Sequence, residues 1–151
     1  MMPILEREAP AKLYQAGHHL ALVNHQRASA RGNKILVVDD DPDLRLGLHI
    51  RLRANYYDIC FASDARSALS TALNEMPDLI ILDIGLPDAD GYAVMQELNT
   101  FSELANVPVI IVTARNRFVH EARCREAGAR RFFEKPVDDL RLLAAIRQLV
   151  G

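Results

Sequence analysis

The chain has 151 residues, half of them hydrophobic, and its 18 basic and 20 acidic residues give a net charge of −2 at pH 7. This length and apolar content suit one compact domain with a sizeable core, so we expect no separate output domain. The small net charge excludes the strong basic field that draws a protein to nucleic acid. Two cysteines cannot form the disulfide framework of a small secreted protein.

The first 33 residues differ in character from the rest of the chain. They contain three of the five histidines and end in the small, polar run ASARGN, so we interpret residues 1–33 as an N-terminal extension or linker. Leu13, Leu20 and Val23 indicate at most a short helix with a ragged apolar side. No part of the sequence approaches the length of a membrane span, and no leader-like segment opens it. We therefore expect a cytoplasmic protein with no direct contact to membrane or nucleic acid.

From residue 34 onward, short apolar runs alternate with amphipathic stretches. Runs rich in Val and Ile predict strands that are buried on both faces of a parallel sheet. Apolar residues at helical spacing predict helices with one buried side. The expected strands are 35–38, 59–62, 79–82, 107–112 and 131–133, and the expected helices are 42–52, 65–73, 91–99, 116–127 and 138–150.

The boundaries of these helices carry their own signals. Asp41 followed by Pro at the first helical position predicts the start of the first helix, and Asp138 predicts the cap of the last. Ser63 or Asp64 opens the second helix, and Gly128 ends the fourth. The alternating order predicts an α/β fold, a doubly wound five-stranded parallel sheet of (βα)5 type with helices on both faces.

Polar side chains follow four of these strands. Asp39 and Asp40 come directly after the first strand, Asp83 after the third, Thr113 after the fourth and Lys135 after the fifth. Because the carboxyl ends of parallel strands meet at one edge of the sheet, we expect these groups to converge on one site. Three neighbouring carboxylates repel one another, which raises their pKa values or demands a cation. The simplest answer is Mg²⁺, which prefers such oxygen ligands. The pattern therefore predicts a phosphoryl-transfer pocket.

Each of these residues could also have a purely structural role. The run Asp39, Asp40 and Asp41 could be only a capping cluster, and Asp41 is interpreted as that alone. Thr113 could simply end a strand. Lys135 is harder to dismiss, because the chain uses 15 Arg and three Lys, and a compact ammonium suits a phosphoryl oxygen where a guanidinium would be bulky.

The same residues, in the same order, closely resemble the receiver domain of two-component response regulators. The motifs that carry the resemblance are VVDDDPDLR, ILDIGLPDADG, VTA and EKPVD, and they are specific because they occur as a set. The resemblance covers residues 34–151 and implies the flavodoxin-like receiver fold of a CheY-like single-domain regulator.

The resemblance implies a role for each acidic residue of the pocket. Asp83 would be the phosphoacceptor. Asp40 and Asp83 would bind Mg²⁺ directly, Asp39 mainly through water, and the backbone carbonyl of Gly85 would complete the protein ligands. Mn²⁺ is expected to substitute for Mg²⁺.

Further residues would act on the phosphoryl group or respond to it. By resemblance, Lys135 contacts the phosphoryl group and is followed by a cis peptide bond to Pro136. Thr113 would donate its hydroxyl to the phosphoryl group and form a switch with Phe132, which stands where receivers often have Tyr. Gly85 and Arg115 flank the route of the attacking water and are expected to set the lifetime of the phosphoryl group.

The function implied is that of a phosphoacceptor signalling protein rather than an enzyme. A histidine kinase or phosphotransfer protein would supply the phosphoryl group, and a conformational switch would alter the docking of an unknown downstream protein. From Ala114 onward eight Arg and one Lys outnumber five acidic residues. Solvated helix faces can explain most of these arginines, but the excess also fits docking of an acidic partner on the face formed by 116–127, 131–133 and 138–150, where we expect it. A phosphorylation-dependent dimer through the last two helices is left open.

Two alternatives belong to other classes. A haloacid-dehalogenase-type phosphatase has a similar order of Asp39-x-Asp41, a later Thr and a lysine, but Asp43 stands where that family has Thr or Val. The acidic motif expected after its lysine also has no counterpart. The other alternative is a receiver-shaped binding module that works without phosphorylation, through its arginine-rich face or its N-terminal segment.

Overall fold

Strands and helices alternate along the chain in the computed structural model, which describes residues 32–151. The extension predicted at residues 1–33, with its short candidate helix, therefore lies almost wholly outside the described residues. The strands are β1 (Lys34–Val38), β2 (Asp58–Ala62), β3 (Leu79–Leu82), β4 (Val109–Thr113) and β5 (Arg131–Glu134). The helices are α2 (Pro42–Ala54), α3 (Ala65–Glu75), α4 (Gly91–Thr100), α5 (Arg117–Glu126) and α6 (Asp139–Val150). None of these helices has the length and apolar character needed to cross a membrane.

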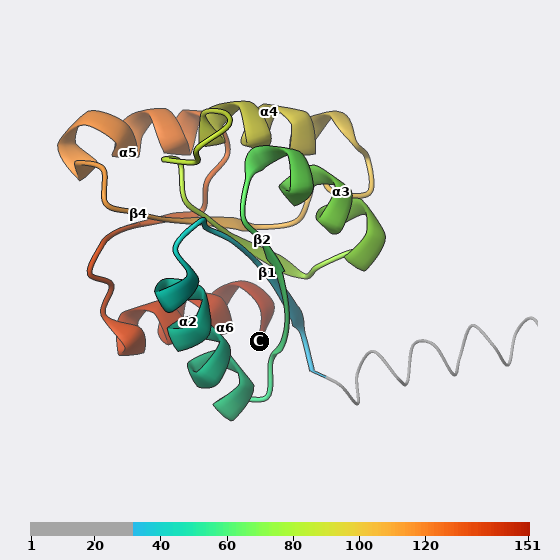
Figure 1. The fold of residues 1–151 in the computed structure, drawn as a ribbon, viewed down its shortest axis with the longest axis vertical. Coiled ribbons are helices and arrows are strands. Elements are labelled where there is room, and N and C mark those ends of the chain that lie inside the picture. Colours follow the sequence, from blue (N-terminus) through green and yellow to red (C-terminus); the bar gives the residue numbers. More distant parts are fainter. Residues whose placement is uncertain (1–31) are drawn as a thin grey trace, which may run out of the picture. The chain divides into compact units, whose positions relative to one another are not determined.

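The strands form one five-stranded parallel sheet in the order β2-β1-β3-β4-β5. Helices α3, α4 and α5 cover one face of the sheet, and α2 and α6 cover the other (Figure 1). The predicted fold class, a doubly wound five-stranded α/β sheet, is confirmed. The strand order reverses between β1 and β3, and ligands of open α/β sheets bind in the crevice at such a point.

The three central strands, β1, β3 and β4, bury both of their faces, and each face of the sheet has its own apolar core. Leu36 and Val38 pack with residues of α3 and α4, whereas Ile35 and Val37 pack with residues of α2 and α6. All four side chains are almost completely buried. This double burial explains why the strands appear in the sequence as continuous apolar runs without alternation.

A short polar side chain caps the first turn of every described helix. Asp41 accepts hydrogen bonds from the first turn of α2, Asp138 caps α6, and Asp64 rather than Ser63 caps α3. The two remaining caps are Asp90 on α4 and Asn116 on α5. The predicted caps at Asp41 and Asp138 are confirmed, and Gly128 follows the end of α5 with a positive φ of 106°.

The prediction for the fourth strand was wrong by two residues at its start. Val107 donates its N–H to the carbonyl of Leu104 in a turn, and Pro108 has no N–H to give to a ladder, so the strand begins at Val109. At its other end the strand includes Thr113, which the sequence pattern placed just after it. Strand β5 likewise runs one residue further than predicted, to Glu134.

Gly91 gives a test of how α4 is fitted against the sheet. A Cβ on Gly91 would lie 2.5 Å from the Cα of Ile84 and 3.0 Å from the backbone oxygen of Asp83. Since Ile84 is fully buried, its backbone cannot give way. We expect Gly91→Ala to lower the free energy of unfolding by about 2 kcal/mol or more, measured by urea denaturation.

The matched control is Gly47→Ala in the middle of α2. A Cβ there would meet nothing nearer than the flexible end of Arg51, at 3.7 Å. Alanine is a better helix former than glycine, so this substitution should raise the free energy of unfolding by up to about 1 kcal/mol. Equal effects of the two substitutions would contradict the close packing of α4.

Candidate functional site

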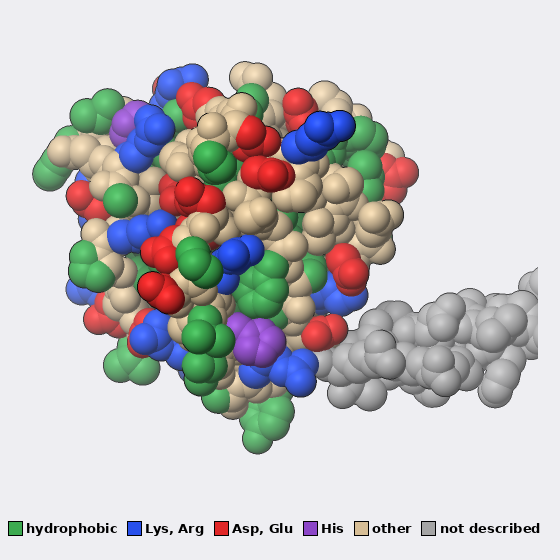
Figure 2. Space-filling model, viewed as in Figure 1, with side chains coloured by type: hydrophobic (Ala, Val, Ile, Leu, Met, Phe, Trp, Pro, Cys, Tyr) green, Lys and Arg blue, Asp and Glu red, His purple; other side chains and the backbone are tan. Residues whose placement is uncertain are grey.

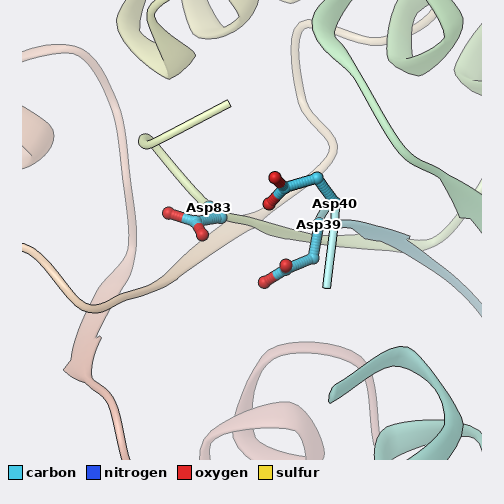
Figure 3. A group of neighbouring side chains, drawn as sticks. All are labelled: Asp39, Asp40 and Asp83. Atoms are coloured by element: carbon cyan, nitrogen blue, oxygen red, sulfur yellow. The ribbon is translucent and has the colours of Figure 1, made fainter. Parts of the chain in front are cut away.

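Three carboxylates meet at the carboxyl edge of the sheet (Figure 3). Asp39 and Asp40 follow β1, and Asp83 follows the neighbouring strand β3. One oxygen atom from each lies within 4.8 Å of the others. Asp39 and Asp83 are only 2% and 7% exposed, whereas Asp40 is exposed to solvent. So much negative charge in a partly buried place is costly unless a cation neutralises it.

Lys135 supplies one positive charge to this cluster. Its Nζ donates to Asp39 Oδ2 at 2.8 Å and to Asp83 Oδ2 at 3.0 Å. Burial works against the charge of this lysine, but the hydrogen bonds to the two carboxylates outweigh it and raise its pKa above the ordinary value. Lys135 is held in place by its own backbone N–H, which donates to the carbonyl of Thr113, and the bond to Pro136 is cis.

The carboxylate of Asp83 is fixed by three donors. Its Oδ1 accepts from the hydroxyl of Thr113 at 2.7 Å and from the backbone N–H of Gly85 at 2.8 Å. Its Oδ2 accepts from Lys135. Thr113 is completely buried, so its hydroxyl depends on this bond. Both oxygens of Asp83 are therefore oriented before any ligand arrives.

Asp39 bears the electrostatic cost of the cluster. Burial raises the pKa of its carboxyl group, and the hydrogen bonds from Lys135 and from the backbone N–H of Asp41 only partly offset this effect. The neighbouring charge of Asp83 acts in the same direction as burial. The arrangement thus favours a second cation close to Asp39.

The donor set fits a hard divalent cation. Mg²⁺ is bound through oxygen, commonly by one or two carboxylates with the remaining positions held by water or phosphate. Asp40 suits this use because, within residues 32–151, its carboxylate accepts no hydrogen bond and faces solvent. Asp39, Asp40 and Asp83 are the residues that would hold the ion.

The remaining predicted site residues lie at the rim or behind it. A Cβ on Gly85 would be 3.4 Å from Arg115 Nε and 3.4 Å from Asp83 Oδ1, so Arg115 lies beside the carboxylate cluster. The side chain of Phe132 is buried in the core on the α4 and α5 side of the sheet, away from the carboxylate cluster. The sequence pattern therefore grouped residues that the structure brings together, apart from Phe132, which lies behind them.

The other aspartates near the pocket have structural tasks. Asp88 accepts hydrogen bonds from the backbone N–H groups of Ala65 and Arg66, and so ties the loop after β3 to the start of α3. Asp90 caps its own helix, α4. Asp41, the second aspartate of the phosphatase-like pattern, is engaged in capping α2.

Sequence reasoning missed a polar cluster between α4 and α5. The hydroxyl of Tyr92 lies 2.8 Å from His120 Nδ1 and 3.7 Å from Cys124 Sγ, and the guanidinium of Arg123 lies 3.7 Å from the centre of the Tyr92 ring. Burial, together with the neighbouring thiol, raises the pKa of Tyr92 to about 12. No signal in the sequence shows this cluster, because it depends on how two helices pack.

A doubly wound sheet with aspartates after β1 and β3, a threonine ending β4 and a lysine after β5 defines a receiver-type protein. Residues 35–147 match the family described as the response regulator receiver domain. This match covers most of the chain, and the protein belongs to that family.

Curated relatives share the domain within longer proteins. Response regulator PleD of Caulobacter vibrioides is 38% identical over 117 residues, which cover 77% of this chain and 26% of PleD. The DNA-binding dual master transcriptional regulator RpaA of Synechocystis is 34% identical over 117 residues, which cover 78% of this chain and 48% of RpaA. The chain thus spans about a quarter and about a half of the length of these relatives.

Solved receiver structures have the same fold. A CheY-like response regulator receiver domain protein from Methanospirillum hungatei is 27% identical with a TM-score of 0.72, covering 78% of this chain and 92% of its own. The receiver domain of the sensor histidine kinase PA1611 from Pseudomonas aeruginosa is 28% identical with a TM-score of 0.73, covering 80% and 98%. That structure has a magnesium ion coordinated in its active site cleft.

Removal of the Lys135 ammonium tests its part in holding the cluster together. We expect Lys135→Met to lower the free energy of unfolding by about 2–4 kcal/mol in Mg²⁺-free buffer, because it leaves two buried carboxylates without their counter-charge. Added Mg²⁺ should restore part of the loss. Urea denaturation with and without Mg²⁺ measures both effects.

Lys34→Met is the matched control. Lys34 pairs with Glu75 at 2.8 Å near the surface, where an ion pair contributes little, so the loss should stay within about 1 kcal/mol and should not respond to Mg²⁺. Similar losses in both variants would contradict the central role of Lys135.

Proposed function

We propose that the protein accepts a phosphoryl group on Asp83 from a histidine kinase or phosphotransfer protein and signals by a phosphorylation-dependent change of conformation. The single observation that carries the proposal is the fixed carboxylate of Asp83, with Thr113 Oγ1 at 2.7 Å and Lys135 Nζ at 3.0 Å. These two donors would also meet a phosphoryl group attached to that carboxylate. Membership of the receiver family supports the same conclusion.

The transfer itself needs little covalent chemistry from the protein. An oxygen of Asp83 forms a bond to phosphorus while the bond from phosphorus to the donor breaks, and the bonding electrons leave with the donor. Lys135 stays close to the oxygens and offsets their negative charge, and Thr113 donates its hydroxyl to one of them. Placement and charge therefore supply most of the catalysis.

A bound divalent cation would add to this charge balance. Asp39, Asp40, Asp83 and the backbone carbonyl of Gly85 are the proposed ligands for Mg²⁺, with Mn²⁺ as a substitute. When bound, the ion would neutralise phosphoryl oxygens and so favour transfer. The residues themselves orient the acceptor oxygen.

The switch would begin with the hydroxyl of Thr113. This hydroxyl already donates to Asp83, so phosphorylation would move its bond from the carboxylate to a phosphoryl oxygen. The backbone of Thr113 pairs with Lys135, and Arg117 at the start of α5 reaches the carbonyl of Phe132 at 3.4 Å. A shift at Thr113 would thus reach both α5 and β5, with Phe132 repacking between them.

The surface affected would serve for docking of a downstream protein. Phe118 and Val119, at the start of α5, are 93% and 69% exposed, and arginines lie beside them. Exposed apolar side chains among basic ones suit a partner with acidic and apolar groups. Because the phosphoryl group stays on Asp83 while the signal is passed on, the protein would act as a stoichiometric phosphoacceptor rather than as a multi-turnover enzyme. It would assist its own phosphorylation and dephosphorylation.

Mg²⁺ affinity tests the proposed metal ligands. We expect Asp40→Asn to weaken Mg²⁺ binding about tenfold or more, since it removes a charged oxygen ligand, as measured by isothermal titration calorimetry. Asp41→Asn is the control, because asparagine caps a helix as well as aspartate. An unchanged affinity in Asp40→Asn would exclude Asp40 as a ligand.

Phosphoryl acceptance can be tested directly with acetyl phosphate. We expect the wild type to gain one phosphoryl group only when Mg²⁺ is present, and Asp83→Asn to gain none, because it lacks the nucleophilic carboxylate. Intact-mass spectrometry measures the gain. Asp90→Asn, in the same loop and with its capping function kept, should behave as wild type, and normal phosphorylation of Asp83→Asn would refute the proposal.

A further inference from the structure

Asp88, in the loop between β3 and α4, accepts two hydrogen bonds from a different part of the chain. Its Oδ1 accepts from the backbone N–H of Ala65 at 2.8 Å, and its Oδ2 accepts from that of Arg66 at 3.1 Å. Both donors belong to the first turn of α3, where backbone N–H groups have no partner within the helix. The helix dipole also favours a carboxylate at this end. The loop is therefore held to α3 by both oxygens of one side chain.

The helix α3 has a cap of its own, which is independent of Asp88. Asp64 accepts from the backbone N–H of Ser67 at 2.7 Å and from its hydroxyl at 2.6 Å. Buried alanines of the helix pack it into the core on that face of the sheet. Asp88 thus adds a second carboxylate to a helix start that is already capped. Its main effect is then on the loop to which it belongs.

This loop carries two groups of the candidate site. The backbone N–H of Gly85 donates to Asp83 Oδ1 at 2.8 Å, and the carbonyl of Gly85 is a proposed ligand for the divalent cation. Among residues 32–151, the two bonds to Asp88 are the only hydrogen bonds that join residues 86–89 to another part of the chain. The buried side chain of Leu86 is the other anchor of the loop. The direction of the Gly85 carbonyl therefore depends on Asp88.

The other half of the site is tied to the same short segment. The backbone N–H of Asp39 donates to the carbonyl of Ala62 at 3.0 Å, and Ala62 ends β2 shortly before α3 begins. The segment from Ala62 to Arg66 is thus hydrogen-bonded to the loop after β1 and to the loop after β3. These two loops provide all three carboxylates of the cluster. A displacement of this segment would change the spacing of the proposed ligands.

We propose that Asp88 is a positioning residue for the divalent cation, which holds the carbonyl of Gly85 in place and couples cation binding to the order of the first turn of α3. The inference rests on the proposed function, because it takes Gly85 and the three carboxylates as the ligands. Asp88 itself is not a ligand, since both of its oxygens are engaged with α3. Mg²⁺ demands near-ideal octahedral geometry, so a loosely held carbonyl would bind it more weakly.

The coupling acts in both directions. If the ordered loop favours the cation, the bound cation must favour the ordered loop by the same factor. The hydrogen bonds to Asp88 would then open less often, and the amides of Ala65 and Arg66 would exchange their hydrogens with solvent more slowly. Exchange at α3 is therefore a readout that does not depend on phosphorylation.

The Mg²⁺ affinity of the full chain, measured by isothermal titration calorimetry, tests the positioning of the loop. We expect Asp88→Ala to weaken Mg²⁺ binding about threefold to tenfold, because it frees the loop without removing a ligand. Asp88→Asn should fall between this variant and the wild type, since asparagine keeps one acceptor oxygen but loses the charge. Asp88 is exposed, so neither substitution should disturb the core, and urea denaturation confirms the folded state.

Asp64→Ala is the matched control. It removes a carboxylate from the same helix start and leaves the hydrogen bonds of the loop in place. Its Mg²⁺ affinity should therefore equal that of the wild type. A general loosening of α3 would weaken binding in both variants, whereas the positioning role affects Asp88→Ala alone.

Hydrogen exchange followed by nuclear magnetic resonance tests the coupling to α3. In the wild type, Mg²⁺ should slow the exchange of the Ala65 and Arg66 amides about threefold to tenfold, in proportion to the affinity lost in Asp88→Ala. In Asp88→Ala the same two amides should not respond to Mg²⁺. Exchange that is unaffected by Mg²⁺ in the wild type would overturn the coupling.

The outcomes separate this inference from the proposed function. Unchanged Mg²⁺ affinity in Asp88→Ala would overturn the inference and leave Asp83 as the proposed phosphoacceptor. An equal loss in Asp64→Ala would trace the effect to the helix, and an equal loss in Asp88→Asn would trace it to charge, and either result would also overturn the inference. No Mg²⁺ binding by the wild type would overturn the proposed metal ligands and this inference together.

Discussion

The interaction on which the site depends is the pairing of one ammonium with two buried carboxylates. Lys135 Nζ joins Asp39 Oδ2 at 2.8 Å and Asp83 Oδ2 at 3.0 Å, although the three residues come from the ends of three different strands. This pairing holds negative charge in a place where burial opposes it. The remaining charge, centred on Asp39 and Asp40, creates the demand for a divalent cation. The cation that neutralises this excess negative charge would also neutralise phosphoryl oxygens during transfer to Asp83.

The sheet makes this pairing possible because the strand residues that precede the site are buried in apolar cores. The strands have apolar cores on both faces, so their polar groups can lie only at the ends, where Asp83 and Thr113 meet. Helix α4 approaches so closely that only glycine fits at Gly91, directly against the backbone of Asp83. Asp83 is thus positioned by packing as well as by hydrogen bonds. Figure 2 shows acidic and basic side chains gathered near the middle of the face in view, where they are accessible to solvent.

The sequence was enough to predict the convergence of Asp39, Asp83 and Lys135, because parallel strands place their carboxyl ends at one edge. It could not predict that Asp88 accepts hydrogen bonds from the start of α3, since that contact joins segments that are distant in the chain. The cluster around Tyr92 depends in the same way on the packing of two helices. Sequence reasoning expected Thr113 to donate its hydroxyl to the phosphoryl group, and the structure shows that this hydroxyl already donates to the carboxylate of Asp83. The spacing of residues in the sequence does not predict the orientation of a side chain such as that of Thr113.

The most direct test of the account is a crystal structure of the protein with Mg²⁺ and beryllofluoride. The account predicts beryllium bonded to the carboxylate of Asp83, with Lys135 and Thr113 donating to its fluorides and a metal ion bound by the carboxylates of Asp39, Asp40 and Asp83. An empty pocket in crystals soaked at saturating concentrations, or beryllofluoride bound away from Asp83, would contradict the claim that this cluster is built to hold a phosphoryl group.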